Sequence, residues 1–245
     1  MLCNSKFMIT ASMLTLLSAC GGGGDDISSP FSGTAEGFWS GSASNGSNLA
    51  LVVLENGETW GLYGGDLYSG AFYGQSTGTG NTFSASGSDF NFNKWSVTSG
   101  TVKGTVVQKS TINATSSQNV SVNLKYESSY EIPASLTAAA GNYSVTGISA
   151  NGSATAVPMT ITVGGLVTVV GVNCSASGKI APRASGKNVY DISMTFNGNS
   201  CALGNGGTAS GIFILDKSVT PNVAVSMALT PSKQDGFFAF GERTN

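Results

Sequence analysis

The chain contains no histidine, and this absence limits the chemistry that its other polar residues could perform. Ser-His-Asp and Cys-His nucleophile systems, His-Glu-x-x-His zinc sites and His-ligated haem all depend on that residue. The sequence also lacks the Ser-x-x-Lys pattern of a Ser-Lys hydrolase and the Gly-x-x-x-x-Gly-Lys loop that holds nucleotide phosphates. We therefore expect a protein that is not an enzyme and that uses no cofactor.

Paired carboxylates are the remaining route to catalysis, because glycoside hydrolysis needs one acidic residue as a proton donor and a second as a nucleophile or base. Glu55 and Glu58 flank an Asn-Gly turn, while Glu127 and Glu131 belong to a predicted strand and the residues after it. A glycan-active hydrolase is thus one alternative. The simpler interpretation of Glu55 and Glu58 is a solvated hairpin tip.

The segment Asp89-Phe90-Asn91-Phe92-Asn93 offers oxygen ligands at alternate positions, as a calcium-binding loop does. Lys94 stands where that loop needs glycine, and Gly100 stands where it needs a bidentate glutamate. The alternation favours an amphipathic strand with Phe90 and Phe92 directed inward. We therefore expect no metal site.

Aromatic residues are concentrated in the first half of the chain, which holds all three tryptophans. Aromatic side chains can form a platform for a sugar or a hot spot for a protein partner. In a glycine-rich barrel they more often fill the interior, and alternation with polar or glycine neighbours favours that role. The candidate ligand-binding residues are Trp39, Trp60, Tyr63, Tyr68, Tyr73 and Trp95.

The first residues have the pattern of an export signal. One lysine, Lys6, precedes an apolar run from Phe7 to Leu17, and Leu17-Ser18-Ala19-Cys20 follows. This tetrapeptide resembles the lipobox of bacterial lipoproteins. The resemblance implies removal of residues 1–19 and attachment of diacylglycerol to the Cys20 thiol. An ordinary secretory signal is the alternative.

The next residues, 20–32, are expected to form a flexible tether, because four consecutive glycines lose too much backbone entropy to hold one conformation. By resemblance to enterobacterial lipoproteins, Gly21 in place of aspartate implies the outer membrane. Glycine-rich hairpins behind such a tether loosely resemble the β-barrel lobes of transferrin-binding protein B and factor H binding protein. That resemblance is one of pattern and carries over no binding residues.

Two cysteines remain once Cys3 is removed with the signal and Cys20 is acylated. A pair of cysteines in an oxidising envelope compartment usually forms a disulfide, so we expect one between Cys174 and Cys201. A redox or metal-binding role would require Cys-x-x-Cys spacing or further ligands, which the sequence lacks.

From residue 33 onward, short runs of β-branched and aromatic residues alternate with glycine, asparagine and serine, which predicts an all-β protein. Val120–Tyr126, Ile192–Phe196 and Val223–Leu229 alternate, so each should have one face on a core and one in water. Asn56-Gly57 and Gly164-Gly165 predict hairpin turns. Further strands are expected at 37–42, 67–73, 82–86, 101–109, 188–196 and 209–215.

Short strands with frequent turns favour an antiparallel sandwich or barrel. They are mostly shorter than the ~9 to 11 residues that a membrane-spanning strand needs. One helical turn is expected at Ser135–Ala140. The segment Gly37-Phe38-Trp39-Ser40-Gly41 is echoed by Gly141-Asn142-Tyr143-Ser144-Val145, which suggests a duplication. We therefore expect a first β domain at 33–134 and a second at 135–245, either as separate units or as halves of one barrel.

Charged residues make up 10% of the chain and the formal net charge is −2, so there is no basic surface for nucleic acid. We expect a non-enzymatic outer-membrane lipoprotein, facing the periplasm or the cell surface, that binds a partner or supports the envelope. The membrane is a partner through the acyl chains. A sharper alternative is a surface receptor or adhesin that captures a protein or glycan from the host or environment.

Overall fold

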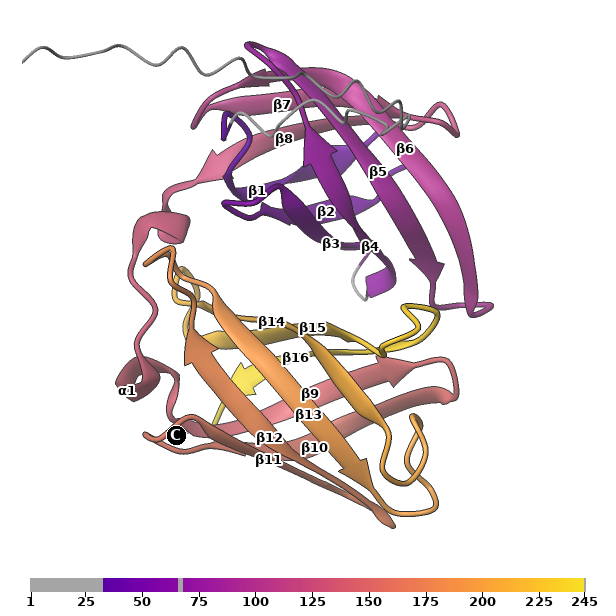
Figure 1. Cartoon of the computed structure of the whole chain (residues 1–245), viewed down its shortest axis with the longest axis vertical. Helices are drawn as coiled ribbons and strands as arrows, with labels where there is room; N and C mark the ends of the chain where they lie inside the picture. The colour runs from indigo at the N-terminus through magenta and orange to yellow at the C-terminus, as the bar shows by residue number, and fades with distance from the viewer. Residues whose placement is uncertain (1–32, 66–67, 245) are drawn as a thin grey trace, which may run out of the picture.

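The computed structural model describes residues 33–65 and 68–244, and it consists of two β-barrels joined by a short connecting segment (Figure 1). Each barrel is a closed sheet of eight antiparallel strands, which confirms the predicted all-β class. The first barrel contains β1 (Gly37–Ala43), β2 (Asn48–Val53), β3 (Glu58–Gly64), β4 (Tyr68–Thr77), β5 (Thr82–Asn91), β6 (Ser96–Val107), β7 (Thr111–Ser116) and β8 (Ser121–Glu127). The second contains β9 (Gly141–Ser149), β10 (Gly152–Ile161), β11 (Leu166–Gly171), β12 (Cys174–Pro182), β13 (Tyr190–Asn197), β14 (Thr208–Asp216), β15 (Val223–Leu229) and β16 (Gly236–Arg243).

Both barrels have the same up-and-down topology, in which every strand pairs with its neighbours in sequence. The pairs β1–β8 and β9–β16 close the two sheets. Closure gives every strand two hydrogen-bonded neighbours, although the first parts of β6 and β10 extend beyond their pairing with β7 and β11.

The connecting segment contains a 3₁₀ turn, η1 (Ser128–Glu131), and one α-helical turn, α1 (Leu136–Ala139). The helical turn lies where it was predicted. The predicted division near Ser135 falls between these two turns. Within the described residues, no helix is long and apolar enough to cross a membrane.

Both predicted hairpins are present. Gly57 and Gly165 have φ angles of +82° and +79°, which glycine adopts without the penalty that a Cβ would bring. The expected strand at 82–86 is too short, because β5 continues to Asn91, and the strand expected at 101–109 begins earlier, at Ser96.

Three apolar clusters hold the molecule together. One fills the interior of the second barrel, one lies inside the first barrel, and the third lies between the two barrels. The third cluster packs the outward faces of β2–β5 against the outward faces of β14–β16 (Figure 1). The two halves of the chain therefore form separate sheets that share a buried interface.

This interface corrects two predictions of sidedness. Phe90 does not point into its own barrel; it packs against Phe238 of the second barrel with ring centroids 5.6 Å apart. The strand at Val223–Leu229 has no solvent face over most of its length: Val225 and Met227 pack in the interface, and Ala224 faces the barrel interior. The alternation of side chains along this strand separates two faces. Here one face is buried in the barrel interior and the other in the interface.

The predicted disulfide between Cys174 and Cys201 is confirmed. It joins the start of β12 to the loop between β13 and β14. The loop closed by this bond has a sequence separation of 27 residues.

Candidate binding site

The interior of the first barrel contains a cavity of about 200 Å³. Its deep part is lined by buried side chains that include Phe83, Ile112 and Leu124. Its mouth is formed by the turns that join β1 to β2 and β7 to β8, with Asn45, Ser47, Ser117 and Gln118 around it. The cavity is therefore an apolar space with a polar rim.

Glycine at inward-facing positions leaves this space open. Gly61 and Gly100 line the cavity, and a Cβ built on Gly100 would meet no atom within 4 Å. In the second barrel, the interior instead carries large side chains on the equivalent faces, among them Met159, Met194 and Phe213. An eight-stranded barrel is just wide enough to be filled by side chains or to hold one small ligand. In this chain the interior of the second barrel is filled by side chains, and the interior of the first retains a cavity.

Other inward glycines allow the wall to curve. A Cβ at Gly74 would collide with the backbone of β5, and a Cβ at Gly87 would collide with the backbone of β4. These residues face each other across the β4–β5 pair. Glycine kinks of this kind let strands bend sharply around a barrel.

A polar pair interrupts the apolar lining. The Tyr63 hydroxyl on β3 donates a hydrogen bond of 2.7 Å to Oδ1 of Asp89 on β5. Tyr63 is paired with Leu49, which begins the strand next to the mouth, so the pair lies in the outer half of the cavity. Burial raises the pKa of the Asp89 carboxyl, although the Tyr63 hydrogen bond opposes that shift. Burial and the nearby carboxylate together raise the pKa of Tyr63, so its hydroxyl remains a hydrogen-bond donor.

The candidate ligand-binding aromatic residues occupy three different environments. Trp39 lies in the first barrel's core, where its Nε1 donates to the Ala35 carbonyl at 2.8 Å. Tyr63 lines the cavity. The other four lie in the interface cluster: Trp60, Tyr68, Tyr73 and Trp95.

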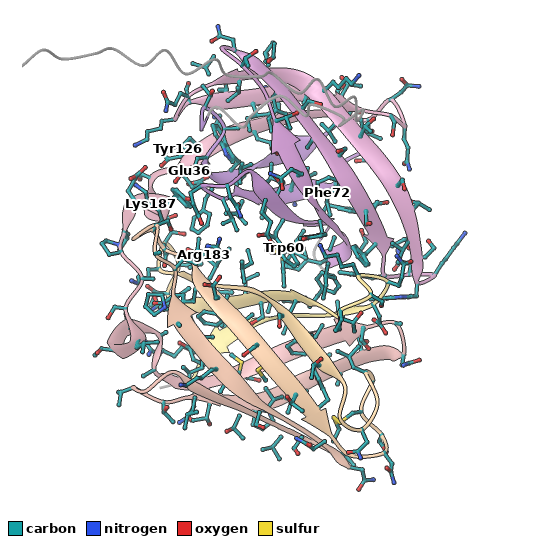
Figure 2. The ribbon with its side chains drawn as sticks, viewed as in Figure 1. Glu36, Trp60, Phe72, Tyr126, Arg183 and Lys187 are labelled. Atoms are coloured by element: carbon teal, nitrogen blue, oxygen red, sulfur yellow. A yellow bond between two sulfur atoms is a disulfide. The ribbon has the colours of Figure 1, made fainter. Side chains whose placement is uncertain are left out.

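Rings from opposite barrels meet directly in that cluster. Tyr68 packs edge-on against Phe240, with centroids 4.8 Å apart, and Trp95 lies 6.4 Å from Phe238. Trp60, which lies on the side of the first barrel that faces the second (Figure 2), is 2% exposed, and its ring centroid is 4.4 Å from that of Tyr73. These side chains bind the second barrel, so little of their surface remains for an external ligand.

Sequence reasoning missed Asp89 as a cavity residue, because Phe90 was assumed to be the inward neighbour. The signal that could have found it is glycine at alternate positions. Gly87 alternates with Ala85 and with Asp89, and all three face the interior. Small inward-facing residues leave space inside a barrel. An acidic residue at the next inward position therefore places one charged group in that space.

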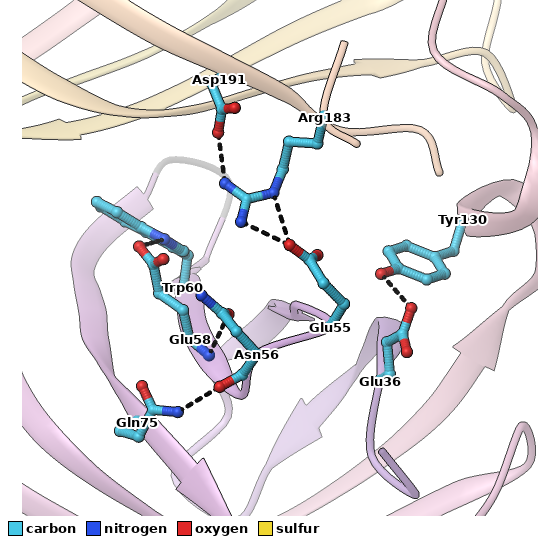
Figure 3. A network of polar contacts seen from close by, with 9 residues as sticks. All are labelled: Glu36, Glu55, Asn56, Glu58, Trp60, Gln75, Tyr130, Arg183 and Asp191. Atoms are coloured by element: carbon cyan, nitrogen blue, oxygen red, sulfur yellow. Dashed lines mark hydrogen bonds and ion pairs between the residues drawn. The ribbon is translucent and has the colours of Figure 1, made fainter. Parts of the chain in front are cut away.

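A polar network lies at one side of the barrel interface (Figure 3). Arg183, in the loop after β12, donates through Nη2 to Glu55 Oε1 at 2.7 Å and through Nη1 to Asp191 on β13. Glu58 Oε1 accepts a hydrogen bond of 2.9 Å from Trp60 Nε1. The carboxylates of the first candidate pair, Glu55 and Glu58, are thus each engaged by a different donor.

A groove of about 330 Å³ runs beside this network and is lined by Glu58, Trp60, Tyr73, Arg183, Asp191 and Lys233, among others. Two carboxylates therefore line one groove, as a glycosidase would require. Asp191 is bound by Arg183 and Glu58 by Trp60. Each of these two contacts lies within one barrel, whereas the ion pair between Arg183 and Glu55 crosses from the second barrel to the first.

The second candidate pair is also engaged. Ser40 donates to Glu127. Glu131 in η1 binds Lys109 at 2.8 Å and Lys187 at 2.7 Å, and it accepts a hydrogen bond from Tyr126. These three hydrogen bonds lower the pKa of Glu131 to about 2. Because Lys109 belongs to the first barrel and Lys187 to the second, Glu131 links the connecting segment to both.

Among the described residues, no three His, Cys, Asp or Glu side chains come together as a metal site would need. Cys20, the predicted lipidation site, and the tether that follows it lie outside the described residues.

No protein-family model matches the sequence, and no curated protein matches it. A crystal structure from Bacteroides fragilis NCTC 9343, described provisionally as that of an outer membrane protein, has 13% sequence identity and a TM-score of 0.26. The match covers 86% of this chain and 96% of that chain.

Proposed function

We propose that the chain is a non-enzymatic binding protein of the bacterial envelope whose first barrel takes up a small, largely apolar molecule. The observation that carries this proposal is the cavity of about 200 Å³ inside the first barrel. Its mouth lies at the turns of two hairpins, so a ligand can enter without the opening of the sheet. Concave, mostly apolar sites with few polar groups are typical of small-molecule binding.

The cavity volume limits the size of the ligand. An apolar cavity of roughly 150 Å³ is large enough to hold benzene. The cavity in the first barrel therefore suits one aromatic ring with a short substituent. The aromatic residues that suggested a glycan or protein ligand are largely covered by the second barrel, which favours this small ligand over a macromolecule.

The proposed location depends on the N-terminal segment. Residues 1–20 resemble a lipoprotein signal with its lipobox, and acylation of Cys20 would anchor the protein in the outer membrane. The disulfide between Cys174 and Cys201 supports an oxidising compartment such as the envelope. Replacement of Cys20 by serine should abolish metabolic palmitate labelling and release the protein from the membrane fraction. Retention of both would contradict the anchor.

The cavity can be tested with propylbenzene as the probe. The mature chain with Cys20→Ser keeps the tether and both barrels but carries no acyl group, and its binding of propylbenzene can be followed by calorimetry and by thermal stabilisation. Gly100→Leu fills open space and should abolish binding without unfolding the barrel. Gly65→Leu is the matched control, since Gly65 also has open space around it but lies outside the cavity. Equal binding by both variants would contradict the proposal.

A further inference from the structure

The charges that line the cavity restrict the chemical class of its ligand further. This inference rests on the proposed function. Among the residues that line the cavity, Asp89 is the one with a charged side chain. The others are apolar side chains, glycines and neutral polar groups, most of which lie toward the mouth. We propose that the ligand is a primary amine with a small apolar body, and that its ammonium group binds Asp89.

Asp89 has a donor from the protein but no cation. Tyr63 donates to Oδ1, and none of the ion pairs among the described residues includes Asp89. A half-buried carboxylate without a cation costs free energy, and proteins normally pair such charges. Burial raises the pKa of this carboxyl, as expected when no positive charge stabilises the ionised form. An ammonium ion on the ligand would supply the missing charge.

The position of Asp89 sets the orientation of this ligand. Asp89 and Tyr63 lie in the outer half of the cavity, and Phe83 and Ile112 lie deeper. A small arylalkylamine would therefore place its ring in the deep apolar part and its ammonium group beside Asp89. A neutral alcohol could donate a hydrogen bond there but would leave the charge uncompensated. A carboxylate would be repelled.

A series of probes that differ at one end tests this preference. We expect 2-phenylethylamine to bind the mature Cys20→Ser chain at pH 7 at least roughly tenfold more tightly than 2-phenylethanol, because a hydrogen bond between charged groups is stronger than one to a neutral donor. The affinity for propylbenzene measures the contribution of the apolar contacts alone. The carboxylate of 3-phenylpropionate would be repelled by Asp89, so this probe should bind most weakly. Calorimetry at constant ionic strength measures all four.

Two variants separate charge from hydrogen bonding. Asp89→Asn keeps the size of the side chain and an acceptor for Tyr63 but removes the charge, so within this variant the amine should bind no more tightly than the alcohol. Tyr63→Phe removes the hydrogen bond and keeps the charge, so the preference for the amine should persist. The wild-type series is decisive even if a variant fails to fold.

The outcomes distinguish this inference from the proposed function. If propylbenzene binds but the amine is no tighter than the alcohol, or if the preference survives in Asp89→Asn, the amine proposal is overturned and the cavity proposal stands. If no probe binds, both are overturned. A preference for the amine that disappears in Asp89→Asn supports both.

Discussion

Tyr143 occupies in the second barrel the position that Trp39 occupies in the first. Each is a buried aromatic residue near the start of its barrel's first strand, and each donates a hydrogen bond to the carbonyl four residues earlier: Trp39 Nε1 to Ala35 at 2.8 Å, and the Tyr143 hydroxyl to Ala139 at 2.7 Å. Each residue also pairs with a last-strand residue that packs on its ring, Tyr126 and Arg243 respectively. The two similar sequence segments therefore form the same structure: an aromatic side chain near the start of the first strand holds the residues that precede that strand.

The hydrogen bond from Tyr143 to Ala139 predicts a loss of stability when the Tyr143 hydroxyl is removed. Tyr143→Phe keeps the ring in place but leaves the buried Ala139 carbonyl without its donor. We expect the free energy of unfolding to fall by about 1 to 2 kcal/mol. Urea unfolding followed by circular dichroism measures the change. An unchanged midpoint would show that the hydroxyl plays no part in joining α1 to β9.

The sequence predicted the all-β class, both hairpins and the disulfide, because each depends on local pattern or on residue type. It predicted the inward face of Ile192–Phe196 correctly but assigned the wrong inward face to β5. Phe90 and Asp89 are neighbours with opposite orientations, and hydrophobicity alone directed Phe90 to the barrel interior. The outward face is apolar because a second barrel covers it, and that contact joins residues too distant in sequence for any local pattern to reveal. The cavity was missed for the same reason.

The interface should therefore be essential for stability. Phe238 is 1% exposed and packs against Phe90, Phe92 and Trp95 of the other barrel. Phe238→Ala should cost about 3 to 5 kcal/mol, since a large buried ring is lost and a cavity remains. All three tryptophans belong to the first half of the chain, and Trp60 and Trp95 lie in the interface, so their fluorescence reports the first barrel and its contact with the second, while circular dichroism reports both barrels. We expect the two signals to give one transition in the wild type and two in the variant.

The matched control for Phe238→Ala is Val172→Ala, because Val172 is 89% exposed. This change should leave both signals in one transition with an unaltered midpoint. A single unaltered transition in Phe238→Ala would contradict a role for the interface in coupling the barrels.

The disulfide lies within the second barrel and should act on stability through that barrel. Cys174 and Cys201 enclose a loop with a sequence separation of 27 residues, and the chain-entropy model assigns such a loop roughly 3 to 4 kcal/mol. Replacement of both cysteines by serine should lower the free energy of unfolding by that amount, and with it the unfolding midpoint. Binding of propylbenzene below the new midpoint should be unchanged, because the cavity belongs to the first barrel. A loss of binding in the folded variant would contradict this separation.

Glu131 should make the connecting segment sensitive to acid. Hydrogen bonds from Lys109, Lys187 and Tyr126 lower its pKa from 4.5 to about 2. Because the folded protein favours the ionised form, this stabilisation is present above pH 4.5 and is lost as the pH falls from 4.5 toward 2. Its carboxylate is about one-third exposed, so Glu131→Gln should cost less than about 1 kcal/mol at neutral pH. The stability difference between wild type and variant should shrink across that pH range, and a constant difference would refute the assignment.

Asp89 should have the opposite pH dependence. Its pKa is raised from 3.8, chiefly by burial, and Tyr63 is the other titratable side chain that lines the cavity. A raised pKa means that the folded protein favours the protonated carboxyl, so the stabilisation is complete below pH 3.8 and is lost as the pH rises through the folded pKa. At pH 7 the empty protein therefore carries an unfavourable charge, and Asp89→Asn should be more stable than the wild type by less than about 1 kcal/mol. Thermal unfolding from pH 3 to pH 7 should show this advantage growing with pH, and 2-phenylethylamine should reverse it because it binds and stabilises the wild type more than the variant. If Asp89→Asn were the less stable protein at pH 7 without ligand, the carboxylate would be a structural group and not a charge held for a ligand.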